Sequence, residues 1–278
     1  MLTSVVIPAK DADDQLLYTL FGFNLQFCAF EQFEVIVLDN ASTDETAEKL
    51  SRFTAHFSLN YVRLRKQKPL AYLLNSGIKL ARGELIVFLA SHMLVPRSFI
   101  GVHQQAHEKA SQLVLLGQDR KRIYSVYEPG FTEIQHAECQ LWLEQYPHIK
   151  RPHTLVKPIP LLEESQIVNE LPFHIGLPCP MAQKRLAIRE KYGPHLTRYR
   201  SPWALFDTHH VSLRKEHLLR AGLFKELPRI AMERDLAKRL VKNGCRFQLD
   251  DKLTVLRQES VQKRASPKSM SPNKNRRA

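Results

Sequence analysis

Short apolar runs and amphipathic stretches alternate along the first ninety residues. The apolar runs are rich in β-branched residues and are bounded by turn-forming residues, which is typical of buried strands. These predicted strands cover residues 2–7, 33–38, 59–64 and 84–89. The spacing of apolar positions between them predicts helices over residues 13–24, from a cap at Ser42 or Thr43 to about Phe57, and over residues 69–80. This alternation indicates an α/β fold with a mostly parallel sheet sandwiched by helices.

The loops after the first, second and fourth predicted strands are the predicted ligand site. Sheets of this kind bind ligands at the carboxyl ends of their strands. These loops span residues 8–14, 39–44 and 90–97. No strand is followed by GxGxxG or GxxxxGK[ST], so the dinucleotide-binding and P-loop classes lack their phosphate-binding loop.

The composition is that of an ordinary folded protein. The chain has 278 residues, of which 44% are hydrophobic and 25% charged, and this excludes disordered and collagen-like classes. No run approaches the ~20 apolar residues of a membrane-spanning helix, and the first residues do not resemble a signal peptide. The four cysteines have no metal-binding spacing and are expected as free thiols. We therefore expect a cytoplasmic protein, with a location at the membrane periphery as the alternative.

Charge is distributed unevenly along the chain, which carries a formal net charge of +13. Residues 1–60 hold nine acidic and three basic residues, so the positive excess lies in the remainder. Residues 261–278 contain six basic and no acidic residues, and we expect them to form a disordered basic tail. Such a tail is either a solvated extension or a weak electrostatic tether to anionic lipid or nucleic acid. We expect no specific nucleic-acid partner.

Four segments of the first half carry a family resemblance. SVVIPAKD, FEVIVLDNASTDET and LAYLLNSGIKLARGELIVFL, followed by Pro96, are similar in order and spacing to the nucleotide-binding half of family 2 glycosyltransferases. In the second half, DTHHVSLRKEHLLRAGLF at 207–224 and MERDLAKRLVKNG at 232–244 resemble the later segments of that family. The resemblance implies a Rossmann-like GT-A fold over residues 1–260, with residues 1–100 as the nucleotide-binding half and residues 101–260 as a smaller acceptor-side half.

The resemblance assigns nucleotide-sugar binding to residues at the strand ends. Asp39 would accept a hydrogen bond from the donor base, usually the N3–H of uracil, and Asn75 would lie on the helix beneath the nucleotide. A turn or capping role for Asp39 is the alternative, as is an amide that ties helix to loop for Asn75. The implied donor-binding residues are Pro8, Ala9, Asp11, Asp39, Asn40, Asn75, Ser91, His92 and Arg257.

The metal motif of the family is altered in this sequence. The D-x-D or D-x-H motif after the fourth strand falls on Ala90, Ser91 and His92. A further ligand, usually a late histidine, falls near residues 254–258, where Arg257 is the closest candidate. Mg²⁺ and Mn²⁺ prefer carboxylate oxygens. We therefore assign no certain cofactor, and Mn²⁺ or Mg²⁺ would have to bind through His92.

Two main interpretations of this change stay open. In the first, positive side chains replace the ion: Arg257 presents a bidentate fork to the leaving diphosphate, and His92 adds a donor. In the second, the protein is an inactive relative that keeps the scaffold and still binds the nucleotide sugar. Weak metal use through His92 is a third alternative.

An inverting transfer needs a carboxylate that takes the proton from the acceptor hydroxyl. The family's catalytic acid is the second residue of an acidic pair, which here reads Met232-Glu233, so Glu233 is the expected base. A helix acid paired with Arg229 or Lys238 is the alternative. Asp207, together with His209, would orient the acceptor or the donor sugar; the alternative is a surface or core role for both.

The resemblance fades between about residues 118 and 200. Helical patches are expected there over 132–145 and 183–191, and insertions of this kind build the acceptor pocket in this fold. The acceptor is therefore unassigned among carbohydrate, lipid-linked and peptide classes. The sequence as a whole predicts transfer of a hexose-type sugar from a nucleoside diphosphate donor, UDP-linked by analogy, to an acceptor hydroxyl, as in polysaccharide biosynthesis.

Overall fold

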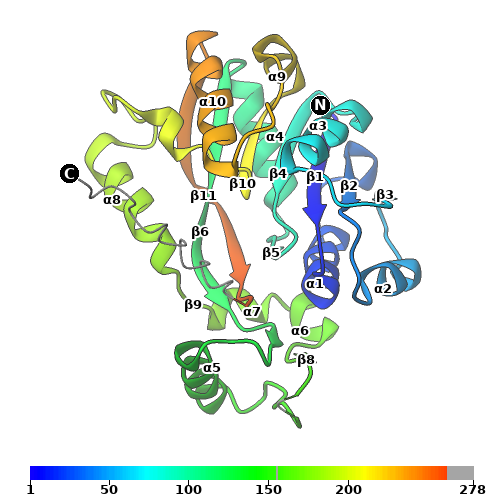
Figure 1. The fold of residues 1–278 in the computed structure, drawn as a ribbon. Coiled ribbons are helices and arrows are strands. Elements are labelled where there is room, and N and C mark those ends of the chain that lie inside the picture. The colour runs from blue at the N-terminus through cyan, green and yellow to red at the C-terminus, as the bar shows by residue number, and fades with distance from the viewer. Residues whose placement is uncertain (155, 262–278) are drawn as a thin grey trace, which may run out of the picture.

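One sheet runs through both halves of the chain (Figure 1). The structure is a computed structural model that describes residues 1–154 and 156–261. Within this part, nine strands form the sheet in the spatial order β3-β2-β1-β4-β10-β6-β11-β5, and β9 pairs with β6. The strands are β1 (Thr3–Ala9), β2 (Phe33–Asp39), β3 (Ser58–Arg63), β4 (Leu85–Leu89), β5 (Met93–Leu94), β6 (Leu113–Ile123), β9 (Leu177–Pro178), β10 (His210–Arg214) and β11 (Arg246–Gln258).

The long strands are parallel except for β10. Strands β1 to β4 pair in parallel, and so do β6 and β11. Strand β10 lies antiparallel between β4 and β6, so the carboxyl ends of the parallel strands share one edge with the start of β10. The expected mostly parallel α/β sheet is confirmed.

Helices cover both faces of the sheet, which explains the continuous apolar runs. On one face, α3 (Leu70–Leu80), α9 (Lys215–Ala221) and α10 (Arg229–Lys242) pack on side chains such as Val6, Ile36 and Phe88. On the other, α1 (Asp13–Asn24), α2 (Thr46–Arg52) and α4 (Phe99–Lys109) pack on Val5, Val37 and their neighbours. A strand buried on both faces has no polar side to alternate with.

The expected helix over residues 44–57 is shorter in the structure, because α2 ends at Arg52. The side chain of Asn24 explains this end. It donates to the carbonyl oxygen of Thr54 at 2.9 Å and accepts from the backbone nitrogen of His56 at 2.8 Å. These bonds hold the following residues against the end of α1 in a non-helical conformation.

A second group of elements lies beyond the carboxyl edge of the sheet (Figure 1). Helix α5 (Glu133–Gln145) begins at Thr132, which forms a capping box with Gln135, and α8 (Gln183–Tyr192) matches the other expected helical patch. Strands β7 (Val126–Tyr127) and β8 (Ile159–Pro160) and helices α6 (Glu164–Val168) and α7 (Leu171–Ile175) share one apolar cluster with α5. The other elements of the described residues are the 3-10 helices η1 (Phe30–Gln32), which precedes β2, η2 (Pro180–Ala182) and η3 (Pro202–Leu205).

Two expectations from composition concern the whole chain. In the described residues, no helix combines the length and apolar character needed to cross a bilayer. Cys28, Cys139, Cys179 and Cys245 are all free thiols. The expected basic tail lies outside the described residues, apart from Val261.

A chain of buried polar side chains joins α4 to β10. The ring nitrogens of His103 lie 2.8 Å from Ser212 Oγ and 3.1 Å from His210 Nε2. Ser212 Oγ also lies 2.8 Å from His107 Nε2. Gly117 makes room for this chain, because a Cβ atom there would lie 1.8 Å from the His210 ring.

Burial keeps these three histidines neutral in the folded protein. Burial, together with Arg214 for His107 and Arg185 for His210, lowers the pKa of these two histidines from 6.5 to about 3. Burial, with His210 and His107, also lowers the pKa of His103 well below 6.5. Below about pH 6.5 the unfolded chain therefore binds more protons than the folded one.

We predict a steep loss of stability in mild acid. The free energy of unfolding should fall as pH drops below about 6.5 towards 3, by about 1.4 kcal/mol per pH unit for each buried histidine. Urea unfolding followed across this range measures the slope. His107→Asn should remove one histidine's share of the slope, whereas the exposed control His148→Asn should keep it. Equal slopes in all three proteins would contradict the assignment.

Candidate functional site

The first two predicted ligand loops meet at the carboxyl edge of the sheet. Asp11 accepts hydrogen bonds from the backbone nitrogen of Thr43 at 2.8 Å and from its hydroxyl at 3.3 Å. The backbone nitrogen of Asp11 donates to Ser42 Oγ at 3.0 Å. Asp11 and Ala41 both adopt left-handed backbone angles, with φ of 47° and 59°, a conformation that residues other than glycine adopt only at an energetic cost. Pro8 and Ala9 lead into this junction, with Ala9 paired to Asp39.

Asp39 lies buried at the bottom of this junction. Its carboxylate accepts from the backbone nitrogen of Ser42 at 2.8 Å and from the hydroxyl of Tyr61 at 2.6 Å, and Arg63 Nε lies 3.6 Å away. Burial and the Asp39 carboxylate raise the pKa of Tyr61 above its usual value, so Tyr61 stays a donor. These contacts are the ones expected if Asp39 stabilises the turn after β2, which is the alternative to a role in binding the donor base.

Polar contacts hold the rim of the same junction. Asn40 exchanges two hydrogen bonds with the backbone of Lys68, at 3.0 and 2.7 Å. A hollow of about 480 Å³ opens beside it, at the ends of β2 and β3. Its walls are formed by Ala41, Ser42, Thr43, Arg63, Leu64 and Arg65.

Asn75 is fully engaged elsewhere. Its amide nitrogen donates to the carbonyl oxygen of Phe224 at 2.8 Å, and its oxygen accepts from the backbone nitrogen of Phe224 at 3.0 Å. These bonds tie α3 to the loop after α9. This is the contact that the alternative interpretation of Asn75 describes.

The third loop brings His92 to the centre of the edge. The carbonyl oxygen of Ser91 accepts from Thr19 at 2.8 Å, and that of His92 accepts from the backbone nitrogen of Gln258 at 2.9 Å. The His92 ring packs edge-on against His209, with centroids 5.6 Å apart. Burial, with His209 and Arg257, lowers the pKa of His92 to about 3, so the ring is neutral.

The side chains at this edge do not fit a divalent cation of the Mg²⁺ or Mn²⁺ type. Ala90 and Ser91 bring no carboxylate to the loop. In residues 1–154 and 156–261, no group of three or more His, Cys, Asp and Glu side chains is arranged to hold a metal. The loop after β4 therefore offers the ring nitrogens of His92, whereas Mg²⁺ and Mn²⁺ prefer oxygen ligands.

A pocket of about 450 Å³ gathers the other predicted residues. The ends of β6 and β11 form one wall, and α8, η3 and the start of α10 form the other. Glu233, Asp207, His209 and Arg257 all line it. The structure therefore brings the expected base, the expected orienting acid and the expected diphosphate-binding cation into one cavity.

Arg257 is held in the pocket by Asp119, a residue that the sequence did not single out. Its Nε donates to Asp119 Oδ2 at 2.8 Å, and its Nη2 contacts the same oxygen at 2.5 Å. Arg257 pairs with Met93 across β11 and β5, which sets it beside the His92 loop. These bonds come from Nε and Nη2. The Nη1 group of Arg257 therefore has no hydrogen-bond partner among the described residues.

Arg229 organises the acidic groups of the pocket. Its guanidinium contacts Glu233 Oε1 at 3.1 Å, His209 Nε2 at 2.7 Å and Asp207 Oδ1 at 3.1 Å. The sequence indicated only the first contact, through the i,i+4 spacing from 229 to 233. The contacts to Asp207 and His209 join segments about twenty residues apart and depend on the fold.

Glu233 is buried and has one free oxygen. Oε1 accepts from the Thr208 backbone nitrogen at 3.0 Å, from the Thr208 hydroxyl at 2.6 Å and from Arg229. Oε2 has no hydrogen-bond partner in the described part of the chain. A carboxylate fixed through one oxygen, with the other facing a pocket, is suited to accept a proton.

Asp207 stays ionised beside it. Burial alone would raise the pKa of Asp207, but hydrogen bonds from His209 and the charge of Arg185 hold it well below its usual value. Arg185 Nη2 lies 3.4 Å from Asp207 Oδ2. The two acids therefore differ. Asp207 keeps its charge, whereas Glu233 is buried but keeps one carboxylate oxygen without a partner in the described part of the chain.

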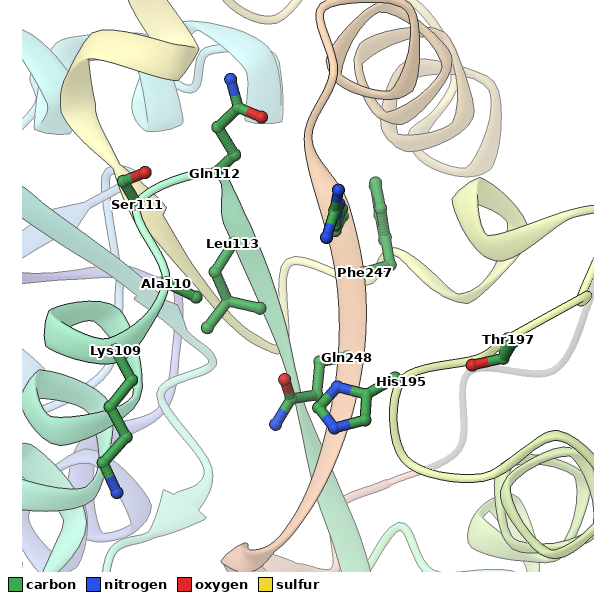
Figure 2. Close-up of a pocket in the computed structure, with 10 residues that line it drawn as sticks. Lys109, Ala110, Ser111, Gln112, Leu113, His195, Thr197, Phe247 and Gln248 are labelled. Atoms are coloured by element: carbon green, nitrogen blue, oxygen red, sulfur yellow. The ribbon is translucent and has the colours of Figure 1, made fainter.

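A larger hollow of about 650 Å³ lies at the opposite end of the sheet (Figure 2). Figure 2 shows that its side chains come from the segment between α4 and β6, the start of β11 and the loop after α8. These residues include Lys109, Gln112, His195 and Gln248. None of the predicted site residues lines this hollow, so it is separate from the site.

Comparison with known proteins agrees with this geometry. Residues 4–161 match the family model described as glycosyl transferase family 2. The chain is 34% identical over 263 residues to the uncharacterized glycosyltransferase YfnE of Bacillus subtilis (strain 168). That match covers 93% of this chain and 65% of the relative, so the chain spans about two thirds of the length of that protein.

Solved structures share the fold at low sequence identity. S. aureus TarS 1-349 in complex with UDP-GlcNAc matches with a TM-score of 0.60 and 17% identity, over 94% of this chain and 59% of TarS. The mannosyltransferase PcManGT from Pyrobaculum calidifontis, in complex with GDP-Man and Mn²⁺, matches with a TM-score of 0.58 and 17% identity, over 94% and 57%. The sheet is thus that of the GT-A fold, and the chain belongs to glycosyltransferase family 2.

Proposed function

We propose that this protein transfers a hexose-type sugar from a nucleoside diphosphate donor, UDP-linked, to an acceptor hydroxyl, with inversion at the anomeric carbon. The observation that carries the proposal is the pocket in which Glu233, Asp207 and Arg257 meet beside His92. Membership of family 2 supports the transferase class. The UDP-GlcNAc bound to TarS supports a UDP-linked donor.

Each side chain then has a chemical task. Glu233 takes the proton from the acceptor hydroxyl through Oε2 as that oxygen attacks the anomeric carbon, and the bond to the diphosphate breaks. Arg229 and Thr208 fix Oε1 and hold the base in place. Asp207 stays charged and orients the sugar hydroxyls. The nucleoside occupies the junction formed by Asp11, Asp39 and the hollow at the ends of β2 and β3.

Positive side chains stabilise the leaving diphosphate in this proposal. Charge develops on its phosphate oxygens, and fixed guanidinium groups stabilise such charge as metal ions do. Arg257 is anchored by Asp119 and keeps Nη1 for this purpose. Neutral His92 donates a hydrogen bond. The donor set of the edge supports a metal-independent reaction, in contrast to PcManGT, which was solved with Mn²⁺.

We also propose that the protein works in the cytoplasm. Free thiols at all four cysteines are typical of a reducing compartment.

Donor screening tests the activity itself. Thermal shift and product release should be measured with UDP-, GDP- and dTDP-linked hexoses, each with Mn²⁺ and with EDTA. We expect stabilisation and turnover with a UDP-linked sugar, and turnover should survive EDTA. Donor binding without turnover under every condition would instead identify an inactive relative, and turnover only with Mn²⁺ would contradict the replacement of the ion.

Removal of the base should affect the chemical step alone. Glu233→Gln keeps the hydrogen bonds to Oε1 but cannot take a proton, so turnover should fall by ~10²–10⁴-fold with little change in UDP affinity. Steady-state kinetics and calorimetric titration with UDP separate the two effects. Glu226→Gln, at an exposed position nearby, is the matched control. Normal turnover in Glu233→Gln would remove Glu233 from the mechanism.

Loss of the anchored arginine should affect binding of the diphosphate. Arg257→Ala should weaken UDP binding by roughly 1.5–3 kcal/mol. Because this variant also leaves the Asp119 carboxylate unpaired, the double variant with Asp119→Asn is needed. UDP affinity should stay low in the double variant. Recovery of wild-type affinity there would mean that Arg257 only neutralises Asp119.

A further inference from the structure

The catalytic pocket has two walls with different charge patterns. On the strand wall, Arg257 pairs with Asp119. At the start of α10, on the helix wall, Arg229 bridges Asp207 and Glu233. On the helix wall, Lys184 of α8 and Arg234 of α10 also line the pocket. Both are exposed, and neither has an acidic partner among the described residues.

Lys184 belongs to a wider basic surface, next to which Arg234 of α10 adds a further positive charge at the pocket. Residues 183–206, which run from α8 through η3, hold six Lys and Arg and one acidic residue. This surface flanks the pocket on the side away from the nucleoside junction of Asp11 and Asp39. Its net positive charge creates a field that attracts anions towards the pocket mouth.

The helix wall faces the place where an acceptor has to enter. Glu233 must reach the acceptor hydroxyl if it is the base, and Arg234 follows it directly on α10. The pocket mouth also exposes two apolar side chains, Met181 at 72% and Ile230 at 63%. An acceptor that fits this wall has carbon-rich parts and a negative charge close to the reacting hydroxyl.

We propose that the acceptor carries a phosphate group near the hydroxyl that is glycosylated, and that Lys184 and Arg234 bind this phosphate. The inference rests on the proposed function, because it takes Glu233 as the base that defines the acceptor side. Phosphate suits the two cations better than a neutral glycan, since charge-assisted hydrogen bonds are the stronger class. The phosphate is either part of a soluble polyol phosphate or part of a lipid headgroup.

Two probes distinguish these sources. The full chain, saturated with UDP so that the donor site is filled, is titrated with a labelled glycerol phosphate oligomer and, in parallel, with unphosphorylated glycerol. Co-sedimentation with phosphatidylglycerol vesicles is compared with phosphatidylcholine vesicles. Binding to the oligomer assigns a soluble acceptor, and binding to the phosphatidylglycerol vesicles alone assigns a lipid-linked one. Either result supports phosphate recognition, provided that it depends on Lys184 and Arg234.

The double variant Lys184→Gln, Arg234→Gln should weaken binding of the responding probe at least ~10-fold. The control Lys79→Gln, Lys242→Gln removes the same charge from distant exposed positions and should change it less than ~2-fold. The C-terminal residues are the same in all proteins and contribute equally.

Measuring UDP affinity alongside probe binding distinguishes a failure of the phosphate site from a failure of the proposed transferase function. If the double variant binds UDP and both probes as the wild type does, the phosphate site is refuted while the transferase remains. If the wild type binds UDP but neither probe, the inference also fails alone. If the wild type does not bind UDP, the proposed function fails first. A large loss of UDP affinity in the double variant would place Lys184 and Arg234 on the donor and overturn their role on the acceptor.

Discussion

The direction of β10 determines the geometry of the site. Every other long strand brings its carboxyl end to the working edge, but β10 runs the opposite way between β4 and β6. Its beginning therefore lies at that edge, and the residues just before it, Asp207 and His209, enter the pocket. The next residue, His210, points into the core against His103. One strand thus links Asp207 and His209 in the pocket to the buried polar chain behind them.

Arg229, together with Arg185, sets the electrostatic balance of the pocket. Arg229 contacts Asp207, His209 and Glu233 at once and offsets two carboxylates that would otherwise repel each other in a buried place. Arg257 and Asp119 form a second, separate pair across two parallel strands. Within the described residues, this pairing leaves Glu233 Oε2 and Arg257 Nη1 without a hydrogen-bond partner, while the rest of each charged group is held in place.

Much of the fold and part of the site could be predicted from the sequence. Strands β1, β2 and β4 and helices α1 and α3 follow local apolar patterns, and the loops at their ends are brought together by topology alone. Asp119 and Arg229 could not be assigned, because Asp119 meets Arg257 only through the alignment of strands that are 138 residues apart in sequence. The end of α2 depends on Asn24, which is distant in the same way. An amide tie from Asn75 to a loop is one of two interpretations of the sequence, but its partner Phe224 is set by the fold.

The way in which Asp39 is buried has a consequence for engineering. Its carboxylate joins the turn after β2 to Tyr61 on the neighbouring strand, so exchange of this residue would disturb the scaffold whatever else it changes. Arg63 and Arg65 border the adjacent hollow from β3 and the loop behind it, and Arg65 makes no such contact within the described residues. Attempts to change the proposed nucleoside preference are therefore better begun by randomising position 65 than by redesigning position 39.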